Sequence, residues 1–429
     1  MTTLHIDRTA APPAGRPTLP ALPTVERTTA AGGPPVVFLP DGLAPVAEVQ
    51  LVFDLGAWNE GSPGLAQFTG RLLTEGTSRL SGPQIAEQLD ALGAFINVES
   101  GADFLTVSLS VLARHLRTAL ELLVHVVADA RFPEAEYELQ LRRSIDSLTV
   151  DEQKTTWQAR RECFHRLFGI THPYGTAFDR QAIEAMSREA LRDCHARHFG
   201  PQSLFVLAAG QFAAADVLEP LNAFVGSTPH QQAVYGQFEQ EAHPQLGRHA
   251  VEMPRQLQAS VRVGQLGFGR SHPDLDALRL LNTVFGGYFG SRLMSNIRED
   301  KGYTYGIGSG WVSYRSGGYL TVATDVGFDY VADTFAQIRH EADRLRQAAI
   351  PESELETARN YLLGRLVSDL ETPFQLADRL KYQWVYGLPE NELARMFDAL
   401  LALTPADLLA AAQRHLRPEE WVEVVAGPA

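Results

Sequence analysis

The sequence predicts an α+β protein made of two homologous halves, each an α/β sandwich in which helices pack on a sheet. Two observations favour this fold class. Short segments with alternating or β-branched apolar residues, which are typical of strands, occur between longer segments with the 3.6-residue apolar spacing of helices. A set of residues from the first half also recurs in the second half, in the same order and at a nearly constant offset.

The evidence for a repeat is a set of identical residues that occur in the same order in both halves. At an offset of 217 residues, Leu191, His198, Pro201 and Gly210 correspond to Leu408, His415, Pro418 and Gly427. The Pro-Glu-x-Glu sequence at 133–136 recurs at 351–354, an offset of 218, so a one-residue insertion or deletion separates the two registers. Such ordered matches are hard to obtain by chance, and we infer a duplication. The simpler alternative is that each Pro-Glu-x-Glu merely begins a helix with acidic residues in its first turn.

The individual elements follow from periodicity. In the first half we expect strands at 36–39, 46–54 and 104–110, and helices at 64–74, 81–92, 112–130 and 134–152. In the second half we expect strands at 260–268 and 318–324, and helices at 274–284, 330–347, 352–370 and 372–386. Pro373 then falls at the first position of the last helix, where its missing N–H costs nothing.

Four segments describe the organisation of the chain. Residues 1–34 are rich in Pro, which predicts an extended arm. Residues 35–226 and 250–429 are the two domains. Between them, residues 227–249 contain Gln and Gly with no clear period, and we interpret this segment as the linker.

Composition excludes several classes of partner. Lys and Arg total 37 against 51 Asp and Glu, a formal charge of -14, which argues against nucleic acid and anionic membrane surfaces. Only Cys163 and Cys194 are present, so no disulfide framework is expected. The N-terminus lacks a continuous apolar segment and carries Asp7, unlike a secretory signal, and no apolar run reaches 18 residues. We therefore expect a cytoplasmic protein without membrane attachment.

The segment Gly-Leu-Ala-Gln67-Phe-Thr-Gly70-Arg71-Leu-Leu-Thr-Glu-Gly-Thr resembles the zinc-binding signature of the pitrilysin/insulinase family, the inverzincins. In that signature two His at i and i+4 bind one zinc ion from one helix face, and a Glu between them is the general base. Here Gln67 and Arg71 occupy the His positions and Gly70 occupies the Glu position. A neutral amide is a poor ligand, a guanidinium repels a dication and glycine transfers no proton. We expect neither a metal ligand nor a cofactor-binding residue in this chain.

The resemblance also implies a third ligand position, a Glu about 75 residues after the second His. Counting from Arg71 leads to Asp146. We predict that Arg71 and Asp146 form an ion pair in place of the metal link between their two helices. The alternative is that both are solvated surface charges.

A second family signature is intact. It consists of Gly286-Gly287…Ser291-Arg292-Leu, followed by Arg298-Glu-Asp-Lys-Gly-Tyr-Thr-Tyr305. This sequence resembles a block of the family in which an Arg and a Tyr, seven residues apart, reach the scissile peptide. The resemblance makes Arg298 and Tyr305 the candidate catalytic residues, because a cationic fork and a phenolic O–H suit a developing oxyanion. Without the surrounding block, the simpler interpretation is that Arg298 interacts with the dipole of its helix and that Tyr305 packs on a strand.

Two other clusters contain residue types that can carry chemistry. Cys194, His195 and His198 have helical spacing for a metal, although a shared role in the fold is favoured because His198 has the counterpart His415. Glu99 and Asp103 beside Asn97 are either an acid pair or protective charges on an exposed strand. The family resemblance makes the edge at Asn97 a candidate docking strand for an extended peptide.

The resemblance implies two halves that face each other across a central cavity admitting unfolded peptides, as in the mitochondrial processing peptidases. Members of this half-size generally dimerise. We therefore expect a non-zinc subunit, inactive alone, of a heterodimeric zinc metallopeptidase that degrades or processes peptides. A homologous partner with His-x-x-Glu-His would hold the zinc, and this chain would supply Arg298 and Tyr305. The alternatives are a catalytically inactive scaffold and a protein that binds peptides without cutting them.

Overall fold

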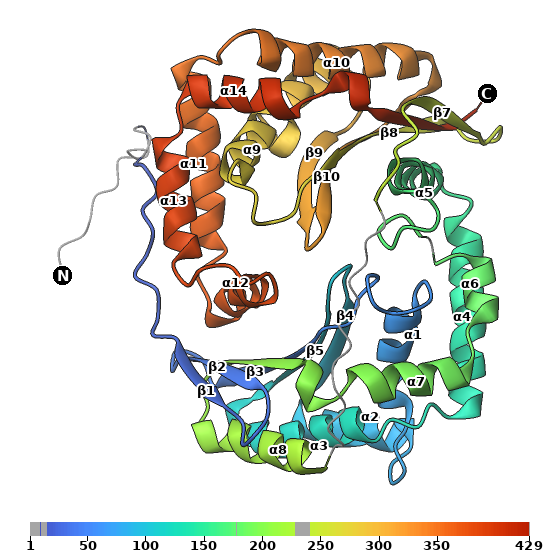
Figure 1. Ribbon diagram of the computed structural model, residues 1–429, viewed down its shortest axis with the longest axis vertical. Coiled ribbons are helices and arrows are strands. Elements are labelled where there is room, and N and C mark those ends of the chain that lie inside the picture. Colours follow the sequence, from blue (N-terminus) through green and yellow to red (C-terminus); the bar gives the residue numbers. More distant parts are fainter. Residues whose placement is uncertain (1–8, 10–14, 177, 228–240, 429) are drawn as a thin grey trace.

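The computed structural model describes residues 9, 15–176, 178–227 and 241–428, and shows two halves that lie one above the other in Figure 1. Each half has one sheet with helices packed around it. Within these described ranges, no helix is both long and apolar enough to cross a membrane.

The first sheet has six strands in the order β1-β2-β6-β3-β5-β4. Their bounds are β1 (Glu26–Thr29), β2 (Pro35–Pro40), β3 (Val46–Phe53), β4 (Phe95–Ser100), β5 (Leu105–Leu112) and β6 (Leu204–Gly210). Only the pairing of β2 with β6 is parallel. All residues of β6 are buried, which fits a central strand covered on both faces.

The second sheet repeats this arrangement with five strands in the order β7-β11-β8-β10-β9. Their bounds are β7 (Gly247–Glu252), β8 (Gln258–Gly267), β9 (Ile307–Tyr314), β10 (Gly317–Gly327) and β11 (Val422–Gly427). The β7–β11 pair is parallel, as β2–β6 is, and the other pairs are antiparallel. The two sheets therefore share both chain order and spatial order, which confirms the predicted pair of homologous halves.

The helices follow the same repeat. The first half has α1 (Leu65–Arg71), α2 (Gly82–Leu92), α3 (Leu116–Ala128), α4 (Glu134–Asp151), α5 (Thr155–Phe168), α6 (Arg180–Ala185), α7 (Arg188–His198) and α8 (Ala214–Ser227). The second half has α9 (Leu275–Asn282), α10 (Val331–Gln347), α11 (Glu352–Ser368), α12 (Pro373–Val385), α13 (Glu392–Ala402) and α14 (Pro405–His415). The matched residues Leu191 and Leu408 are both buried at the fourth position of an 11-residue helix. Pro133 and Pro351 both precede the first residue of theirs.

The start of α12 illustrates how local sequence determines these boundaries. Thr372 Oγ1 accepts a hydrogen bond from the Gln375 N–H at 3.2 Å, and Pro373 occupies the first helical position, as predicted. Thr404 caps α14 in the same way, with Asp407 in the place of Gln375. Helices α12 and α14 therefore begin where a threonine side chain satisfies one of the otherwise unpaired N–H groups of the first turn.

Each half covers part of the sheet of the other half. Helix α12, from the second half, packs on β2 and β6 with Leu376 and Ala377 buried against Leu207. Helix α5, from the first half, packs on β8 and β11 of the second sheet. Its residues Ala159 and Leu167 are buried there. The two halves are thus joined by an exchange of helices as well as by the chain itself.

Residues 15–34 of the predicted arm are described, and they are docked on the rest of the protein. Residues 15–25 run along the second half, where Arg16 forms an ion pair with Glu356 at 3.0 Å, before β1 joins the edge of the first sheet (Figure 1). Strand β7 begins at Gly247, within the segment 227–249 predicted as linker. Both differences have one cause, since these segments pair with sheet edges that a polar or Pro-rich sequence does not reveal.

Candidate functional site

The degenerate zinc motif lies on α1, whose first turn is held by a buried carboxylate. Glu60 accepts hydrogen bonds from the N–H groups of Gly64 and Ala66, both at 2.9 Å. Burial raises the pKa of Glu60, and these two backbone donors partly offset the increase. Residues Leu65, Ala66, Phe68, Thr69 and Gly70 are buried, so the helix presents Gln67 and Arg71 to a cavity.

The general-base position at Gly70 has no room for a side chain. A Cβ atom built there would lie 2.7 Å from Val98 Cγ1 on β4 and 3.1 Å from Leu105 Cδ1. Both contacts are tighter than normal packing allows, and Val98 has a short, branched side chain that cannot swing away. Edge strand β4 has therefore closed over the space that a glutamate would need.

Restoring the motif is consequently expected to destabilise the protein. We expect the triple variant Gln67→His/Gly70→Glu/Arg71→His to be less stable than the double variant Gln67→His/Arg71→His by about 1–3 kcal/mol, because the glutamate overpacks against Val98. Urea denaturation of both variants measures the difference. Addition of Val98→Ala to the triple variant should recover part of the loss. Equal stability of the triple and double variants would contradict the steric argument.

The cavity in front of Gln67 and Arg71 has a volume of about 610 Å³. One face of each of helices α1, α4 and α5 lines it, together with the turn after β4, the loop after α5, Ile183 of α6 and Tyr314 of β9. The helix residues are Gln67 and Arg71 of α1, Ser144, Ser147, Leu148 and Asp151 of α4, and Trp157, Arg160, Arg161, Phe164 and His165 of α5. This spacing of three, four and seven residues is the spacing of a single helix face.

The predicted ion pair between Arg71 and Asp146 is wrong. Asp146 is exposed and does not line the cavity, whereas its neighbour Ser147 does. A step of one residue along an α-helix rotates a side chain by about 100°, so the count from Arg71 was one residue short. The position that faces the motif therefore carries a serine hydroxyl, and the residues present do not fit a zinc ion.

Arg298 and Tyr305 lie next to each other at the start of edge strand β9. Arg298 Nε donates a hydrogen bond to the backbone carbonyl of Tyr305 at 3.1 Å. The guanidinium carbon lies 4.5 Å from the centre of the Phe289 ring, a cation–π distance. The Tyr305 side chain is 94% exposed, and its hydroxyl group contacts no polar group of the described residues. The sequence expectation that these two residues act together is therefore compatible with their positions, although neither lines the 610 Å³ cavity.

A polar network holds the loop that carries Tyr305. Asp333 at the start of α10 accepts hydrogen bonds from Lys301 Nζ and from the Tyr303 hydroxyl, both at 2.9 Å. Hydrogen bonds from Gln337, Lys301 and Tyr303 lower the pKa of Asp333 to about 2. The carboxylate is therefore ionised at neutral pH, and its hydrogen bonds to Lys301 and Tyr303 attach the loop between Arg298 and Tyr305 to α10.

Asp103 joins the two halves and is not part of an acid pair with Glu99. It lies in the turn between β4 and β5 and is 3% exposed. Its carboxylate accepts hydrogen bonds from the hydroxyl groups of Tyr174 and Tyr386, both at 2.7 Å, and from the Arg315 N–H at 2.9 Å. Burial, and then the negative charge of Asp103, raise the pKa of both tyrosines, which remain donors. Glu99, by contrast, is exposed and contacts Asn97 at 3.0 Å.

The histidine and cysteine cluster on α7 serves the fold. Cys194 is buried, and His195 Nε2 lies 2.6 Å from the backbone carbonyl of Val127. Among the described residues, a different group, His272, Asp274 and His415, has the proximity of a metal site. Its carboxylate is already engaged, by His415 Nε2 at 2.6 Å and by Arg414 at 2.9 Å. This arrangement anchors α14 to the start of α9 rather than leaving a ligand free for a cation.

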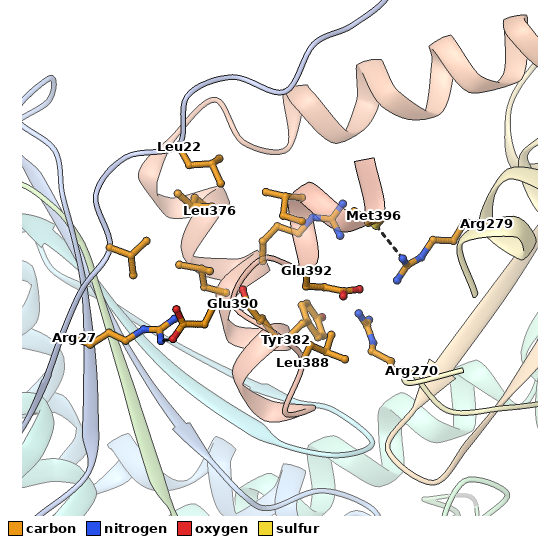
Figure 2. Close-up of a pocket in the computed structure, with 15 residues that line it drawn as sticks. Leu22, Arg27, Arg270, Arg279, Leu376, Tyr382, Leu388, Glu390, Glu392 and Met396 are labelled. Carbon is orange, nitrogen blue, oxygen red and sulfur yellow. Dashed lines mark hydrogen bonds and ion pairs between the residues drawn. The ribbon is translucent and has the colours of Figure 1, made fainter. Parts of the chain in front are cut away.

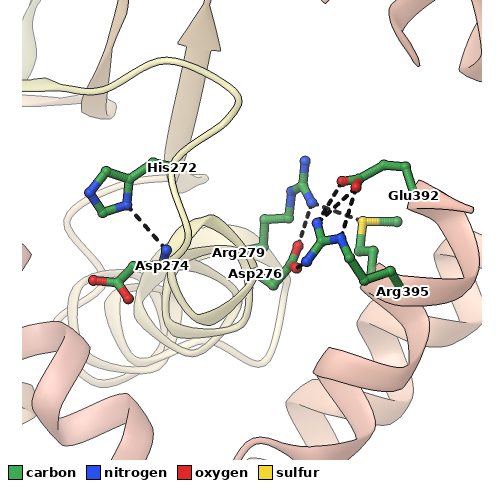
Figure 3. A network of polar contacts seen from close by, with 7 residues as sticks. His272, Asp274, Asp276, Arg279, Glu392 and Arg395 are labelled. Carbon is green, nitrogen blue, oxygen red and sulfur yellow. Dashed lines mark hydrogen bonds and ion pairs between the residues drawn. The ribbon is translucent and has the colours of Figure 1, made fainter. Parts of the chain in front are cut away.

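The charged residues that follow Asp274 on α9 also form ion pairs within the protein. Figure 3 shows Asp276 between Arg279 and Arg395, at 2.6 Å and 3.3 Å. Arg395 in turn contacts both carboxylate oxygens of Glu392. This network ties α9 to α13, and its groups are partners of one another.

A second cavity, of about 430 Å³, lies between the docked arm and helices α12 and α13 (Figure 2). Arg27 and Glu390 form an ion pair at the side of the arm. On the opposite side, Arg279 donates to Met396 Sδ at 2.9 Å. The cavity lining combines apolar residues, among them Leu22 and Leu376, with arginine and glutamate side chains.

Sequence reasoning missed two features of the site. The clamp at Asp103 has no local signal, since its partners are 71, 212 and 283 residues away in the chain. The arginines of α5 do have one, because Trp157, Arg160, Arg161 and Phe164 are spaced as one helix face. Assigning that helix from the sequence would have placed both arginines on one helix face, but their position beside the degenerate motif comes only from the tertiary structure.

Comparison with known families gives two matches along the chain. The profile described as "Insulinase (Peptidase family M16)" matches residues 36–172, which include the motif on α1. The profile described as "Peptidase M16 inactive domain" matches residues 185–362, which include Arg298 and Tyr305.

Individual proteins agree with these matches. An uncharacterized zinc protease of Streptomyces coelicolor is 24% identical over 94% of this chain and 90% of its own length. The non-peptidase homolog YmxG of Helicobacter pylori is 23% identical over 83% of each chain. Among solved structures, a peptidase M16 inactive domain from Pseudomonas fluorescens superimposes with a TM-score of 0.88 and 27% identity, covering 94% of this chain and 98% of that one.

Proposed function

We propose, from the premise that this chain belongs to the insulinase (M16) family of peptidases, that it is the non-zinc subunit of a two-subunit peptidase. The partner would be a homologous chain that carries His-x-x-Glu-His, and the substrate would be an unfolded peptide. This chain alone would not hydrolyse peptides.

The observation that carries this proposal is the contrast between the two signatures. On α1, all three chemical positions are lost, and the space of the general base is filled by Val98. At β9, the two residues of the other signature are adjacent, and the Tyr305 hydroxyl points into solvent with no protein partner among the described residues. A scaffold needs no exposed, unpartnered tyrosine beside an arginine, whereas a shared active site does.

In the pair, zinc held by the partner would supply the activated water. Arg298 and Tyr305 would bind the carbonyl oxygen of the scissile peptide as negative charge develops on it. Arg298 uses Nε on the carbonyl of Tyr305, and its Nη1 lies 3.8 Å from Glu299 Oε1, so Nη2 is the nitrogen left to contact the substrate. That same bond fixes the backbone of Tyr305, so the arginine also positions the tyrosine.

Reconstitution tests the proposal directly. We expect the purified chain to contain no stoichiometric zinc by elemental analysis and to leave unstructured peptides intact. Mixed with a homologous chain that carries His-x-x-Glu-His, it should form a complex by size-exclusion chromatography and cleave the same peptides. A stoichiometric zinc ion in this chain, or full activity of the partner without it, would overturn the proposal.

The second candidate is a protein that binds peptides or other subunits without catalysis. The Helicobacter pylori relative described as a non-peptidase homolog favours it. It predicts that a complex forms but that Arg298 and Tyr305 can be replaced without any effect on hydrolysis. The two candidates therefore differ in one measurement, the activity of the reconstituted pair with altered Arg298 or Tyr305.

A further inference from the structure

The 610 Å³ cavity carries an excess of positive charge that the proposed function does not use. Arg71, Arg160 and Arg161 line it, and Asp151 is the carboxylate on its lining. Asp151 is already paired with Lys154 at 2.7 Å. Within the part of the chain that the structure describes, none of the three guanidinium groups forms an ion pair, in a protein with a formal charge of -14.

Aromatic rings hold two of these arginines in place. The guanidinium carbon of Arg161 lies 4.7 Å from the centre of the Trp157 ring, and that of Arg160 lies 5.7 Å from the centre of the Phe164 ring. Stacking of this kind supports the flat face of a guanidinium and leaves its N–H edge available for a planar anion. The groups are therefore preorganised by α5 itself.

One donor in the cavity lacks an acceptor. Arg161 Nε is buried, and no described protein atom accepts a hydrogen bond from it. A buried, unpaired N–H is costly unless a ligand or water satisfies it. Nearby Arg166, by contrast, pairs with Glu162 at 2.7 Å. Arg270 Nε and Arg417 Nε also lack an acceptor among the described residues, but neither residue lines this cavity.

The electrostatics of the cavity depend on arginine alone. Burial, and then the nearby Arg161 cation, lower the pKa of His165, which keeps this histidine neutral near pH 7. Arginine itself stays charged over the whole accessible pH range. The lining therefore keeps its positive charge under any assay condition.

We propose that this cavity binds a carboxylate group of a peptide through Arg71, Arg160 and Arg161, at the position where the family signature would hold a metal. That the ligand is a peptide rests on the proposed function. It is also supported by the lining, because Ser100 and Gly101 at the end of β4 border the same cavity. Strand β4 is the last strand of its sheet and pairs only with β5. A segment added along its free edge would end at the arginines.

The carboxylate could belong to the C-terminus of a peptide or to an acidic side chain, and one set of peptides distinguishes these two sources. Three fluorescent peptides of equal length would be used: one amidated and without acidic residues, one with a free C-terminus, and one amidated with a single internal Glu. Fluorescence anisotropy with the full chain alone measures binding at low salt. We expect at least one carboxylate peptide to bind about tenfold or more tightly than the neutral peptide, since charge-assisted bidentate contacts are strong. Tighter binding of the free C-terminus identifies a terminal carboxylate, and tighter binding of the Glu peptide identifies a side chain.

Single substitutions assign the site. Arg71→Gln, Arg160→Gln and Arg161→Gln should each weaken binding of the preferred carboxylate peptide about tenfold without changing binding of the neutral peptide. Arg192→Gln is the matched control, because Arg192 is an exposed arginine on α7 that does not line the cavity. Thermal melting of each variant confirms that it is folded.

The outcomes separate this proposal from the proposed function. Equal binding of all three peptides, or carboxylate binding that survives all three substitutions, overturns the carboxylate site. The measurement needs neither a partner nor hydrolysis. Selective binding together with an inactive reconstituted pair would therefore support the site and reject the shared active centre.

Discussion

In the reconstituted pair, Tyr305→Phe is expected to lower kcat by about 10²–10³-fold, because it removes one hydrogen-bond donor to a developing oxyanion. The substitution deletes only the hydroxyl of a side chain that is 94% exposed, so folding should not change. Activity is measured on a peptide substrate, with complex formation followed by size-exclusion chromatography. Tyr361→Phe is the control, since Tyr361 is another partly exposed tyrosine and lies on α11.

Arg298→Ala should reduce activity at least as much as Tyr305→Phe. It removes the cation and also the hydrogen bond from Nε to the Tyr305 carbonyl. Arg298→Lys keeps a positive charge but loses the fork, so an intermediate activity is expected. If the Tyr305 and Arg298 variants both retain full activity in an intact complex, the cross-subunit role is wrong and the scaffold candidate gains.

Loss of the Asp103 carboxylate should have the largest effect on stability. We expect Asp103→Ala to lower the free energy of unfolding by about 3–5 kcal/mol, because it removes the acceptor of the buried Tyr174 hydroxyl and of the partly buried Tyr386 hydroxyl and Arg315 N–H at once. Two of these partners belong to the second half, so the contact between the halves is weakened together with the fold. Urea denaturation followed by circular dichroism measures the change.

Smaller substitutions test the mechanism of this clamp. Tyr386→Phe and Tyr174→Phe each remove one hydrogen bond to a charged acceptor and should cost about 1.5–3 kcal/mol. Because both act on one carboxylate, their combined effect should depart from the sum of the single effects. A loss of less than 1 kcal/mol for Asp103→Ala would show that the clamp contributes little.

The architecture could be predicted because its signals are local or repeated. Apolar periodicity located the main helices, and the paired residues Leu191 and Leu408 revealed two copies of one unit. Turn chemistry predicted Pro373 at the first position of α12. Each of these signals is contained in a short stretch of sequence, or in a comparison of two stretches.

The errors concern features that only the tertiary structure determines. The prediction of Asp146 rests on a count along the chain, and an error of one residue on a helix moves a side chain to another face. Asp103 was read as an exposed charge because it lies beside the edge strand, whereas distant tyrosines surround it. Val98 closing over Gly70 is likewise a contact between a strand and a helix that sequence spacing does not reveal. The loss of the zinc ligands was visible from the sequence, but the cationic cavity that replaces them was not.

The exchange of α5 and α12 has a consequence for synthesis of the protein. On the ribosome, residues of the first sheet emerge long before α12, which begins at Pro373, so Leu207 and its neighbours lack their cover until the chain is nearly finished. Exposed apolar strands in an unfinished chain are prone to aggregate and are the usual targets of chaperones. The nascent first half should therefore stay bound to a chaperone, or remain protease-sensitive, until the last quarter of the chain has been translated. Although the unit is present in two copies, the two halves would complete their folding together, after α12 has been synthesised.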